Sequence, residues 1–183
     1  MQDHNECASI FNYAGIYMVL DVNSPLPNES INQMAPWTSY NSAYLNRTFA
    51  ILDAFREYPN TLGFFSANEL INDLTNDFNA PYIRAVTRDL KAYMAARGGR
   101  QIPVGYSAAD VRPILVDTAN YVSCSISGTN DGSSGGKSDF FGLNSYSWCN
   151  GDNFMTSTYD VLASDFANTT IPVVSLVCIN FHR

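Results

Sequence analysis

The chain has 183 residues, of which 46% are hydrophobic, so it is long enough to bury one sizeable core. Its net charge is -7 and only ten residues are Lys or Arg, with no basic run, which argues against a nucleic-acid-binding protein. No apolar stretch reaches the roughly 18 residues that a membrane span requires.

The first third of the chain alternates between helical and strand patterns. Residues 7–14 are predicted to be the end of a helix, closed by Gly15 in a left-handed conformation. A buried strand follows at residues 16–20, and residues 24–39, which contain three prolines, are predicted as a long functional loop. Helical spacing then predicts a helix over residues 43–58, which Pro59 stops.

The alternation continues to the end of the chain. Strands are predicted at residues 62–65, 101–106, 139–146 and 171–177, and helices at residues 80–96, 110–119 and 157–167. Such alternation indicates an α/β fold with a parallel sheet and right-handed crossovers. Because no glycine-rich fingerprint follows the first strand, a (β/α) barrel is favoured over a Rossmann sheet.

Polar residues cluster where the predicted strands end: Asp21, Asn68, Glu69, Tyr106, Asn144 and Tyr146. In barrels, ligands bind at this end of the strands. Glu69 has an apolar strand behind it, and a desolvated carboxyl group keeps its proton more readily, as a general acid requires. The alternative is an acidic residue near the start of a helix, favoured there by the helix dipole.

The compartment is ambiguous from the residues alone. The four cysteines are widely spaced with no Cys-x-x-Cys pair, which argues against a zinc site. Sequons begin at Asn28, Asn46 and Asn168 and are glycosylation acceptors in a secreted protein. Residues 1–7 are polar and acidic, unlike a signal peptide.

Longer stretches carry a more specific signal. They are IYMVLDVN at residues 16–23, NTLGFFSANELIN at 60–72, AVTRDLK at 85–91, IPVGYSAAD at 102–110 and DFFGLNSYSWC at 139–149. In order and spacing, the chain resembles glycoside hydrolase family 72, the fungal cell-surface β-1,3-glucanosyltransferases. The resemblance implies an incomplete (β/α)8 TIM barrel of approximately strands three to seven. Residues 1–183 are then expected to be one partial catalytic domain, without the first strands, the last strand or any C-terminal domain.

The resemblance also implies roles for individual residues. Glu69 matches the acid/base and Asn68 its sugar-binding neighbour, while Asp21 matches the acidic residue after strand three. The implied substrate-binding set is Asp21, Asn23, Ser24, Pro25, Glu29, Ser30, Ile31, Asn68, Asp110, Arg112 and Tyr146. The implied partner is a β-1,3-glucan oligosaccharide or polymer, and no metal or organic cofactor is expected.

One position departs from the family pattern. Retaining transfer uses two carboxylates about 5 Å apart, one as acid/base and one as nucleophile. The nucleophile position holds Leu176, which has no lone pair with which to attack an anomeric carbon. The family activity, β-1,3-glucan transglycosylation in cell-wall assembly, therefore has an alternative here, a non-catalytic remnant that at most binds glucan.

The family context extends to the cysteines and to the location of the protein. Cys149 and Cys178 are the implied disulfide candidates, whereas Cys7 and Cys124 are expected to lack partners within this chain. Full-length members are expected at the extracellular face of the plasma membrane or in the cell wall, held by a GPI anchor. This chain is expected to lack the signal peptide and the anchor signal.

Overall fold

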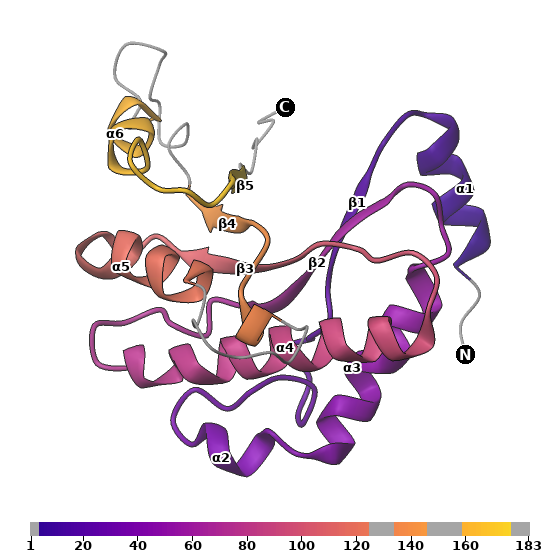
Figure 1. Ribbon diagram of the computed structural model, residues 1–183, viewed down its shortest axis with the longest axis horizontal. Coiled ribbons are helices and arrows are strands. Elements are labelled where there is room, and N and C mark those ends of the chain that lie inside the picture. The colour runs from indigo at the N-terminus through magenta and orange to yellow at the C-terminus, as the bar shows by residue number, and fades with distance from the viewer. Residues whose placement is uncertain (1–3, 125–133, 146–158, 177–183) are drawn as a thin grey trace, which may run out of the picture.

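The computed structural model describes residues 4–124, 134–145 and 159–176. Within these ranges the chain forms a five-stranded sheet in the order β1-β2-β3-β4-β5, with every neighbouring pair parallel (Figure 1). The strands are β1 (Met18–Asp21), β2 (Thr61–Asn68), β3 (Val104–Ala109), β4 (Phe141–Asn144) and β5 (Val173–Leu176). Strands that follow one another in sequence and in the sheet are the arrangement of a (β/α) barrel, so the predicted partial barrel is confirmed.

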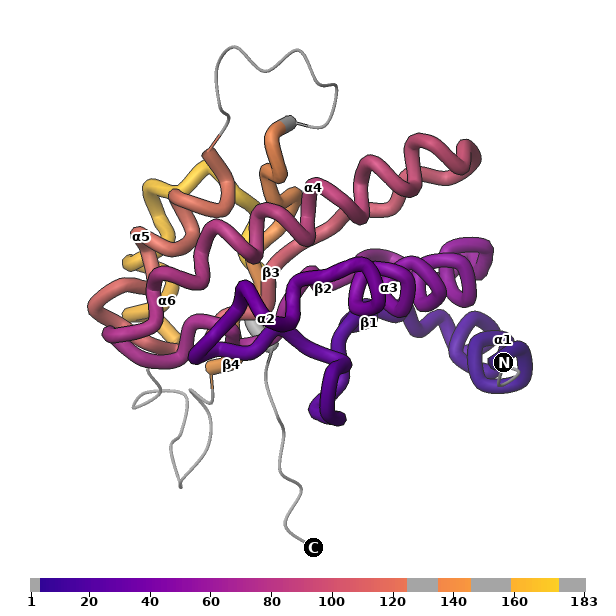
Figure 2. The backbone as a smooth tube through the Cα atoms, turned by 90° about the horizontal axis from the view of Figure 1, so that it is seen from below, coloured from indigo at the N-terminus to yellow at the C-terminus, as the bar shows by residue number. Residues whose placement is uncertain are grey.

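One helix precedes the first strand, and the others connect successive strands. The helices are α1 (Asn5–Tyr13), α2 (Pro36–Ser39), α3 (Ser42–Phe55), α4 (Ala80–Arg97), α5 (Arg112–Ser123) and α6 (Tyr159–Asp165), with short 3-10 turns η1 (Asp77–Asn79) and η2 (Ser134–Gly136). The long helix α4 packs beside α3 and α5 and against β2 and β3, as the views in Figures 1 and 2 show. It is therefore the main outer support of the strands that carry the predicted site.

Local sequence signals explain most helix boundaries. The Asn41 side chain accepts hydrogen bonds from the backbone N–H groups of Ala43 and Tyr44 at 3.0 and 3.1 Å, which caps α3. Gly15 has φ +71°, so the predicted left-handed residue after α1 is confirmed. The prediction that residues 24–39 are loop throughout was wrong, because Pro36 starts the one-turn helix α2.

The core lies between the sheet and α4. Phe64, Val104 and Phe141 of the strands are fully buried there. They belong to one hydrophobic cluster with the apolar face of α4, which consists of Ile83, Val86, Leu90 and Met94. These residues repeat at helical spacing, which is why the sequence pattern located α4 within one residue.

Two phenylalanine rings pack against glycines of neighbouring strands. A Cβ added at Gly105 would lie 2.7 Å from the Phe140 ring, and one at Gly142 would lie 2.7 Å from the Phe65 ring. The two rings also contact each other, with 5.3 Å between their centroids. Glycine is required at both positions because any side chain would occupy the space of a ring.

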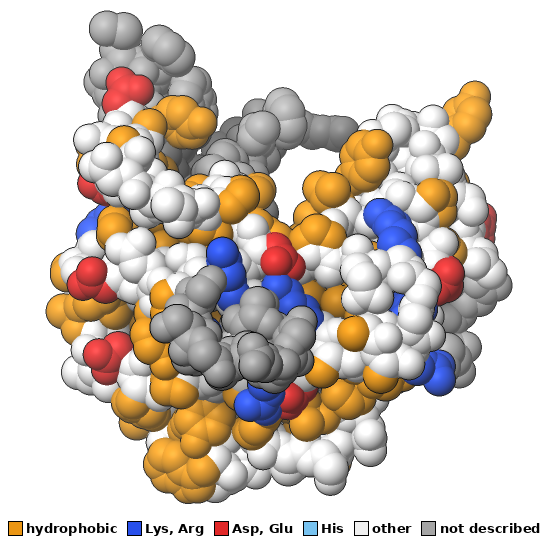
Figure 3. Space-filling view, in the orientation of Figure 1, with side chains coloured by type: hydrophobic (Ala, Val, Ile, Leu, Met, Phe, Trp, Pro, Cys, Tyr) orange, Lys and Arg blue, Asp and Glu red, His pale blue; other side chains and the backbone are white. Residues whose placement is uncertain are grey.

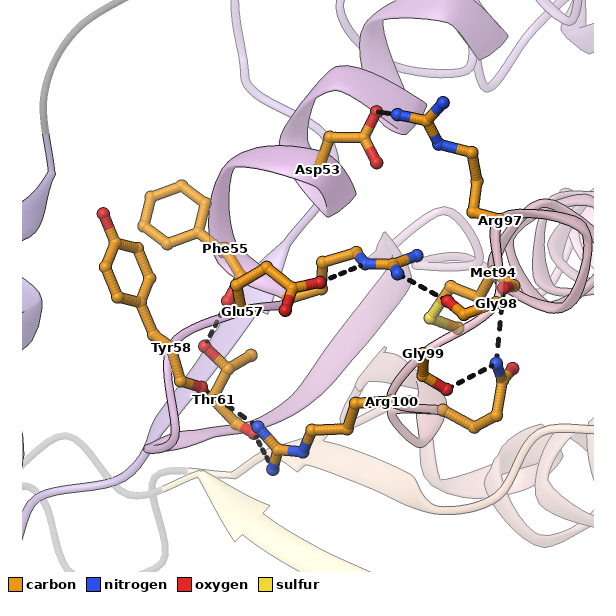
Figure 4. Close-up of polar contacts among 12 residues, drawn as sticks. Asp53, Phe55, Glu57, Tyr58, Thr61, Met94, Arg97, Gly98, Gly99 and Arg100 are labelled. Carbon is orange, nitrogen blue, oxygen red and sulfur yellow. Dashed lines mark hydrogen bonds and ion pairs between the residues drawn. The ribbon is translucent and has the colours of Figure 1, made fainter.

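The ends of the helices near the start of β2 are joined by arginines (Figure 4). Arg56 donates to the Gly98 carbonyl at 2.5 Å, and Arg100 donates to the Tyr58 and Thr61 carbonyls at 3.0 and 2.7 Å. These contacts join the end of α3, the start of β2 and the segment after α4. In barrels this end of the strands serves stability, whereas ligands bind at the other end.

The described residues form no basic patch on the face of the molecule that Figure 3 shows. On the face in Figure 3, Lys and Arg side chains are interspersed with Asp and Glu. No helix of the described residues is both long and apolar enough to cross a bilayer.

Candidate active site

Glu69 directly follows β2, at the carboxyl end of the sheet. Its backbone is left-handed, with φ +48°, a conformation that costs a non-glycine residue about 1–3 kcal/mol. Two contacts hold it there. The Glu69 N–H donates to the Ser107 carbonyl at 2.8 Å, and the Glu69 carbonyl accepts from Gln33 Nε2 at 2.7 Å.

The Glu69 carboxylate is held by Asn144, at the end of β4. Asn144 Nδ2 donates to Glu69 Oε1 at 2.6 Å and to Asn68 Oδ1 at 3.1 Å. Asn144 Oδ1 accepts from the Ser107 hydroxyl at 3.1 Å. Residues from the ends of three adjacent strands thus lie together around Asn144, as expected when parallel strands end at the same edge.

Tyr106, which was predicted to belong to the polar residues at the strand ends, lies in the core instead. Its side chain is fully buried, and its hydroxyl accepts from the Ile71 N–H at 3.0 Å. Burial raises the pKa of Tyr106 well above its ordinary value. From the core, Tyr106 therefore holds the backbone of the segment that follows Glu69, at Ile71.

Asp21 and Asn23 form a second polar group, at the end of β1. Asp21 Oδ1 accepts from both the backbone N–H and the side-chain amide of Asn23, at 2.8 Å each. Asn23 in turn accepts from the Tyr44 hydroxyl at 2.6 Å and donates to the Ser66 carbonyl at 3.0 Å. Desolvation raises the pKa of Asp21, while the hydrogen bonds from Asn23 oppose that shift.

The loop after β1 is anchored to α3. Glu29 accepts from the Ser24 hydroxyl at 2.6 Å and pairs with Arg47 at 2.5 Å, and Arg47 also donates to the Val22 carbonyl at 2.8 Å. The Ser24 hydroxyl lowers the pKa of Glu29, and Arg47 adds to this effect. Ser24 and Glu29 therefore shape the loop, while Pro25 is exposed.

A cavity of about 310 Å³ lies between this loop and the end of β2. Four predicted substrate-binding residues line it: Asn23, Ser30, Ile31 and Asn68. The other lining residues, which were not predicted, are Asn32, Gln33, Ala67 and Leu70. Amide groups beside an apolar wall suit a ring that carries hydroxyl groups on its edge. The structure thus brings Asn23, Ser30, Ile31 and Asn68 to one cavity next to Glu69.

Asp110 and Arg112, both predicted to bind substrate, lie together just after β3, where they bind each other. Arg112 forms an ion pair with Asp110 through its Nε atom and contacts Asp165 at 3.1 Å. The Ser145 hydroxyl donates to Asp110 at 3.1 Å. These contacts connect the ends of β3 and β4 with α6, so both side chains have structural partners here.

Three predicted residues, Tyr146, Cys149 and Cys178, lie outside the described residues. For Leu176 the structure gives the backbone register, which pairs it with Asn144. Position 176 therefore lies at the same edge of the sheet as Glu69.

The described parts of the chain contain no group of three potential metal ligands. Cys7 and Cys124 are exposed and form no disulfide.

Comparison with known proteins decides the family. The model of the glucanosyltransferase family, glycoside hydrolase family 72, matches residues 1–178. This chain belongs to that family. Among curated relatives, the Aspergillus fumigatus 1,3-beta-glucanosyltransferase gel2 is 52% identical over 171 residues, which are 93% of this chain and 35% of the relative. The probable 1,3-beta-glucanosyltransferase GAS3 of Saccharomyces cerevisiae is 49% identical and is matched over 34% of its length.

Solved structures of the family share the fold. A crystal structure of Saccharomyces cerevisiae Gas2 with a small compound superimposes with a TM-score of 0.84 at 33% identity, covering 100% of this chain and 40% of that one. A mutant Gas2p in complex with laminaritetraose and laminaripentaose gives a TM-score of 0.83 at 33% identity, over 39% of its chain. The chain thus spans roughly a third of the length of the curated relatives that it matches.

Proposed function

We propose that the protein takes part in β-1,3-glucan transglycosylation, with Glu69 as the acid/base. The observation that carries this proposal is the Glu69 carboxylate, which Asn144 holds at the carboxyl end of a barrel sheet. Its chain neighbours Asn68 and Leu70 line a cavity of about 310 Å³. The relatives named 1,3-beta-glucanosyltransferases and the Gas2p complex with laminari-oligosaccharides support the same substrate class.

The chemistry is a retaining double displacement. In the family reaction, the acid/base at position 69 gives its proton to the glycosidic oxygen as the C1–O bond of the donor breaks, and the nucleophilic carboxylate expected at the position of Leu176 bonds to C1. The acid/base then removes a proton from the hydroxyl of a second glucan chain, whose oxygen displaces the nucleophile. Asn68, Asn23 and the other residues of the cavity hold the donor sugar, while Asp21 orients Asn23 through two hydrogen bonds.

A second candidate function is glucan binding without transfer. Leu176 favours it, because leucine stands at the strand end where the retaining mechanism requires the nucleophile. In this alternative, Asn68, Glu69 and the loop over residues 23–31 bind sugar, and no covalent intermediate forms.

Incubation with reduced laminari-oligosaccharides distinguishes the two functions. Transglycosylation yields products longer than the substrate, and Glu69→Gln abolishes them. Glucan binding alone yields none, while laminaripentaose still binds in a calorimetric titration. A Leu176→Glu variant supplies the second carboxylate, so elongation that appears only in this variant assigns the defect to position 176. Failure of the unmodified chain to bind any laminari-oligosaccharide refutes both functions.

We infer further that the full-length protein acts outside the cell, at the plasma membrane or cell wall, and carries a GPI anchor. The three sequons and the disulfide candidates Cys149 and Cys178 support an oxidising, secretory route. Release of the full-length protein from intact cells by a phosphatidylinositol-specific phospholipase, with a mass decrease after deglycosylation, is the expected result. Retention in the cytosolic fraction would contradict it.

A further inference from the structure

Asn144 was not assigned to the site by the family resemblance, yet it contacts both residues that carry the proposed chemistry. Its Nδ2 atom has two protons, and each has an acceptor: Glu69 Oε1 at 2.6 Å and Asn68 Oδ1 at 3.1 Å. One amide nitrogen therefore bridges the two side chains. Its donor capacity is fully used by this bridge.

The neighbouring strand β3 supports this amide at its oxygen atom. Ser107, which is 1% exposed, donates its hydroxyl to Asn144 Oδ1 at 3.1 Å. Its backbone carbonyl meanwhile accepts from the Glu69 N–H at 2.8 Å. If the Asn144 amide were turned over, its oxygen would face the Glu69 carboxylate, and two acceptors would oppose each other. Ser107 thus contacts both the backbone of Glu69 and the amide that binds its carboxylate, while the carboxylate itself selects the orientation of that amide.

We propose that Asn144 is a positioning residue that determines which atoms Asn68 and Glu69 present to a bound glucan. The proposal rests on the proposed function. Because Asn68 Oδ1 accepts from Asn144, the Asn68 NH2 group is the part that remains to donate to a sugar hydroxyl. Because Glu69 Oε1 accepts from Asn144, the proton that Glu69 exchanges with the glycosidic and acceptor oxygens is carried on Oε2.

Three substitutions test the bridge by calorimetric titration with laminaripentaose. Asn144→Asp keeps the shape but replaces the donor with an acceptor, and we expect about tenfold weaker binding or more. Ser107→Ala removes only the hydroxyl and is expected to weaken binding by about threefold. Ser107→Thr retains the hydroxyl and is expected to restore wild-type affinity. Asn120→Asp, which makes the same change at an exposed position on α5, controls for added charge.

Side-chain amide NMR gives a readout that requires no ligand. The two Nδ2 protons of Asn144 are expected to exchange slowly with solvent in the wild type and rapidly in Ser107→Ala. Wild-type binding by a folded Asn144→Asp variant, or equal protection in both NMR samples, overturns the proposal. If the wild type binds no laminaripentaose, the proposed function fails, and the NMR comparison still decides whether Asn144 is supported by Ser107.

Discussion

At the scale of single residues, the left-handed backbone of Glu69 depends on a side chain that is distant in sequence. Gln33 donates to the Glu69 carbonyl at 2.7 Å, and its own carbonyl accepts from Asn79 Nδ2 at 3.0 Å. Gln33→Ala removes the donor, so we expect a loss of about 1 kcal/mol in unfolding free energy, measured by urea denaturation. Met34→Ala changes an exposed neighbour in the same loop and should have no comparable effect. Equal stability of both variants would contradict the role of Gln33.

Asp21 gives a prediction with a definite pH dependence. Burial raises its pKa in the folded protein above the unfolded value of 3.8, so the ionised carboxylate destabilises the native state at neutral pH. As the pH falls through the raised pKa, the folded state takes up the proton first and this cost disappears. Asp21→Asn keeps the acceptor oxygen for both Asn23 contacts. We expect it to be more stable than the wild type at pH 7, with the difference vanishing near pH 4.

Asp73 provides a matched control of opposite sign. Its pKa is lowered by hydrogen bonds from Thr75, so its ionised form favours the folded state. Asp73→Asn should therefore lower stability at pH 7, and the loss should fade as the pH falls below about 4. Thermal unfolding of the three proteins between pH 3 and pH 8 compares these slopes directly. The same slope for both variants would show that burial does not govern Asp21.

The residues of the site were predictable to different degrees. Glu69, Asn68 and Asp21 could be found because each follows a strand pattern, and a strand end has a known direction in a parallel sheet. Gln33 and Ser107 could not, because their roles arise from contacts across 36 and 37 residues of sequence, respectively, to Glu69 and Asn144. No local pattern marks a side chain whose only function is to accept or donate at such a distance.

At the scale of elements, Tyr40 connects the end of α2 to α4. Its hydroxyl donates a short hydrogen bond to Asp89, and Arg88 contacts the same hydroxyl at 3.1 Å. Desolvation and the Asp89 charge raise the pKa of Tyr40 to about 12. The stabilisation from the neutral hydroxyl is therefore complete below pH 10 and is lost as the pH rises through 12.

Tyr40→Phe tests this connection. Because the pair is partly exposed, we expect a loss of about 1 kcal/mol at pH 7, measured by chemical denaturation. The difference from the wild type should shrink between pH 10 and pH 12. Tyr13→Phe, at a side chain that is 96% exposed, should change neither the stability at pH 7 nor its dependence on pH. A pH-independent deficit in Tyr40→Phe would show that packing, not the hydroxyl, supports the contact.

Most elements were predictable because their apolar residues follow a clear period. The apolar face of α4 and the Pro81 and Gly98 signals at its ends located that helix closely. The strand at residues 62–65 was predicted too short, since β2 continues through Ser66 and Asn68. Polar residues at a strand end carry no apolar pattern, and here the continuation is stabilised by pairing with β3.

At the scale of the whole molecule, Gly105 allows close packing across the sheet. Gly105→Ala would bring a methyl group within 2.7 Å of the Phe140 ring, so we expect a loss of about 1–3 kcal/mol in unfolding free energy. The double variant Gly105→Ala/Phe140→Leu should recover part of this loss, because leucine leaves space that the ring occupied. Denaturant titrations of the single and double variants measure this coupling. Strict additivity would contradict a clash with the Phe140 ring and would leave the Phe140 carbonyl oxygen, 2.6 Å from the added methyl group, as the source of the loss.

The parallel order of the strands also explains how the site forms. Glu69, Ser107 and Asn144 are separated by 37 or 38 residues along the chain, yet they meet because β2, β3 and β4 end at the same edge. Sequence reasoning could predict that edge from the strand order. It could not predict the Arg112–Asp110 pairing, because charged residues at strand ends are compatible with either a ligand or a protein partner.

The pairing of Leu176 with Asn144 has a consequence for synthesis. A donor activated as an α-laminaribiosyl fluoride already has the anomeric configuration of the missing covalent intermediate, so it needs no nucleophile. Glu69 would take the proton of the acceptor hydroxyl as the new C1–O bond forms and fluoride leaves. The Leu176→Gly variant, which has no side chain at the nucleophile position, should then lengthen laminari-oligosaccharides without degrading the product. Fluoride release that depends on both acceptor and Glu69 is the expected measurement, and release unchanged by Glu69→Gln would contradict it.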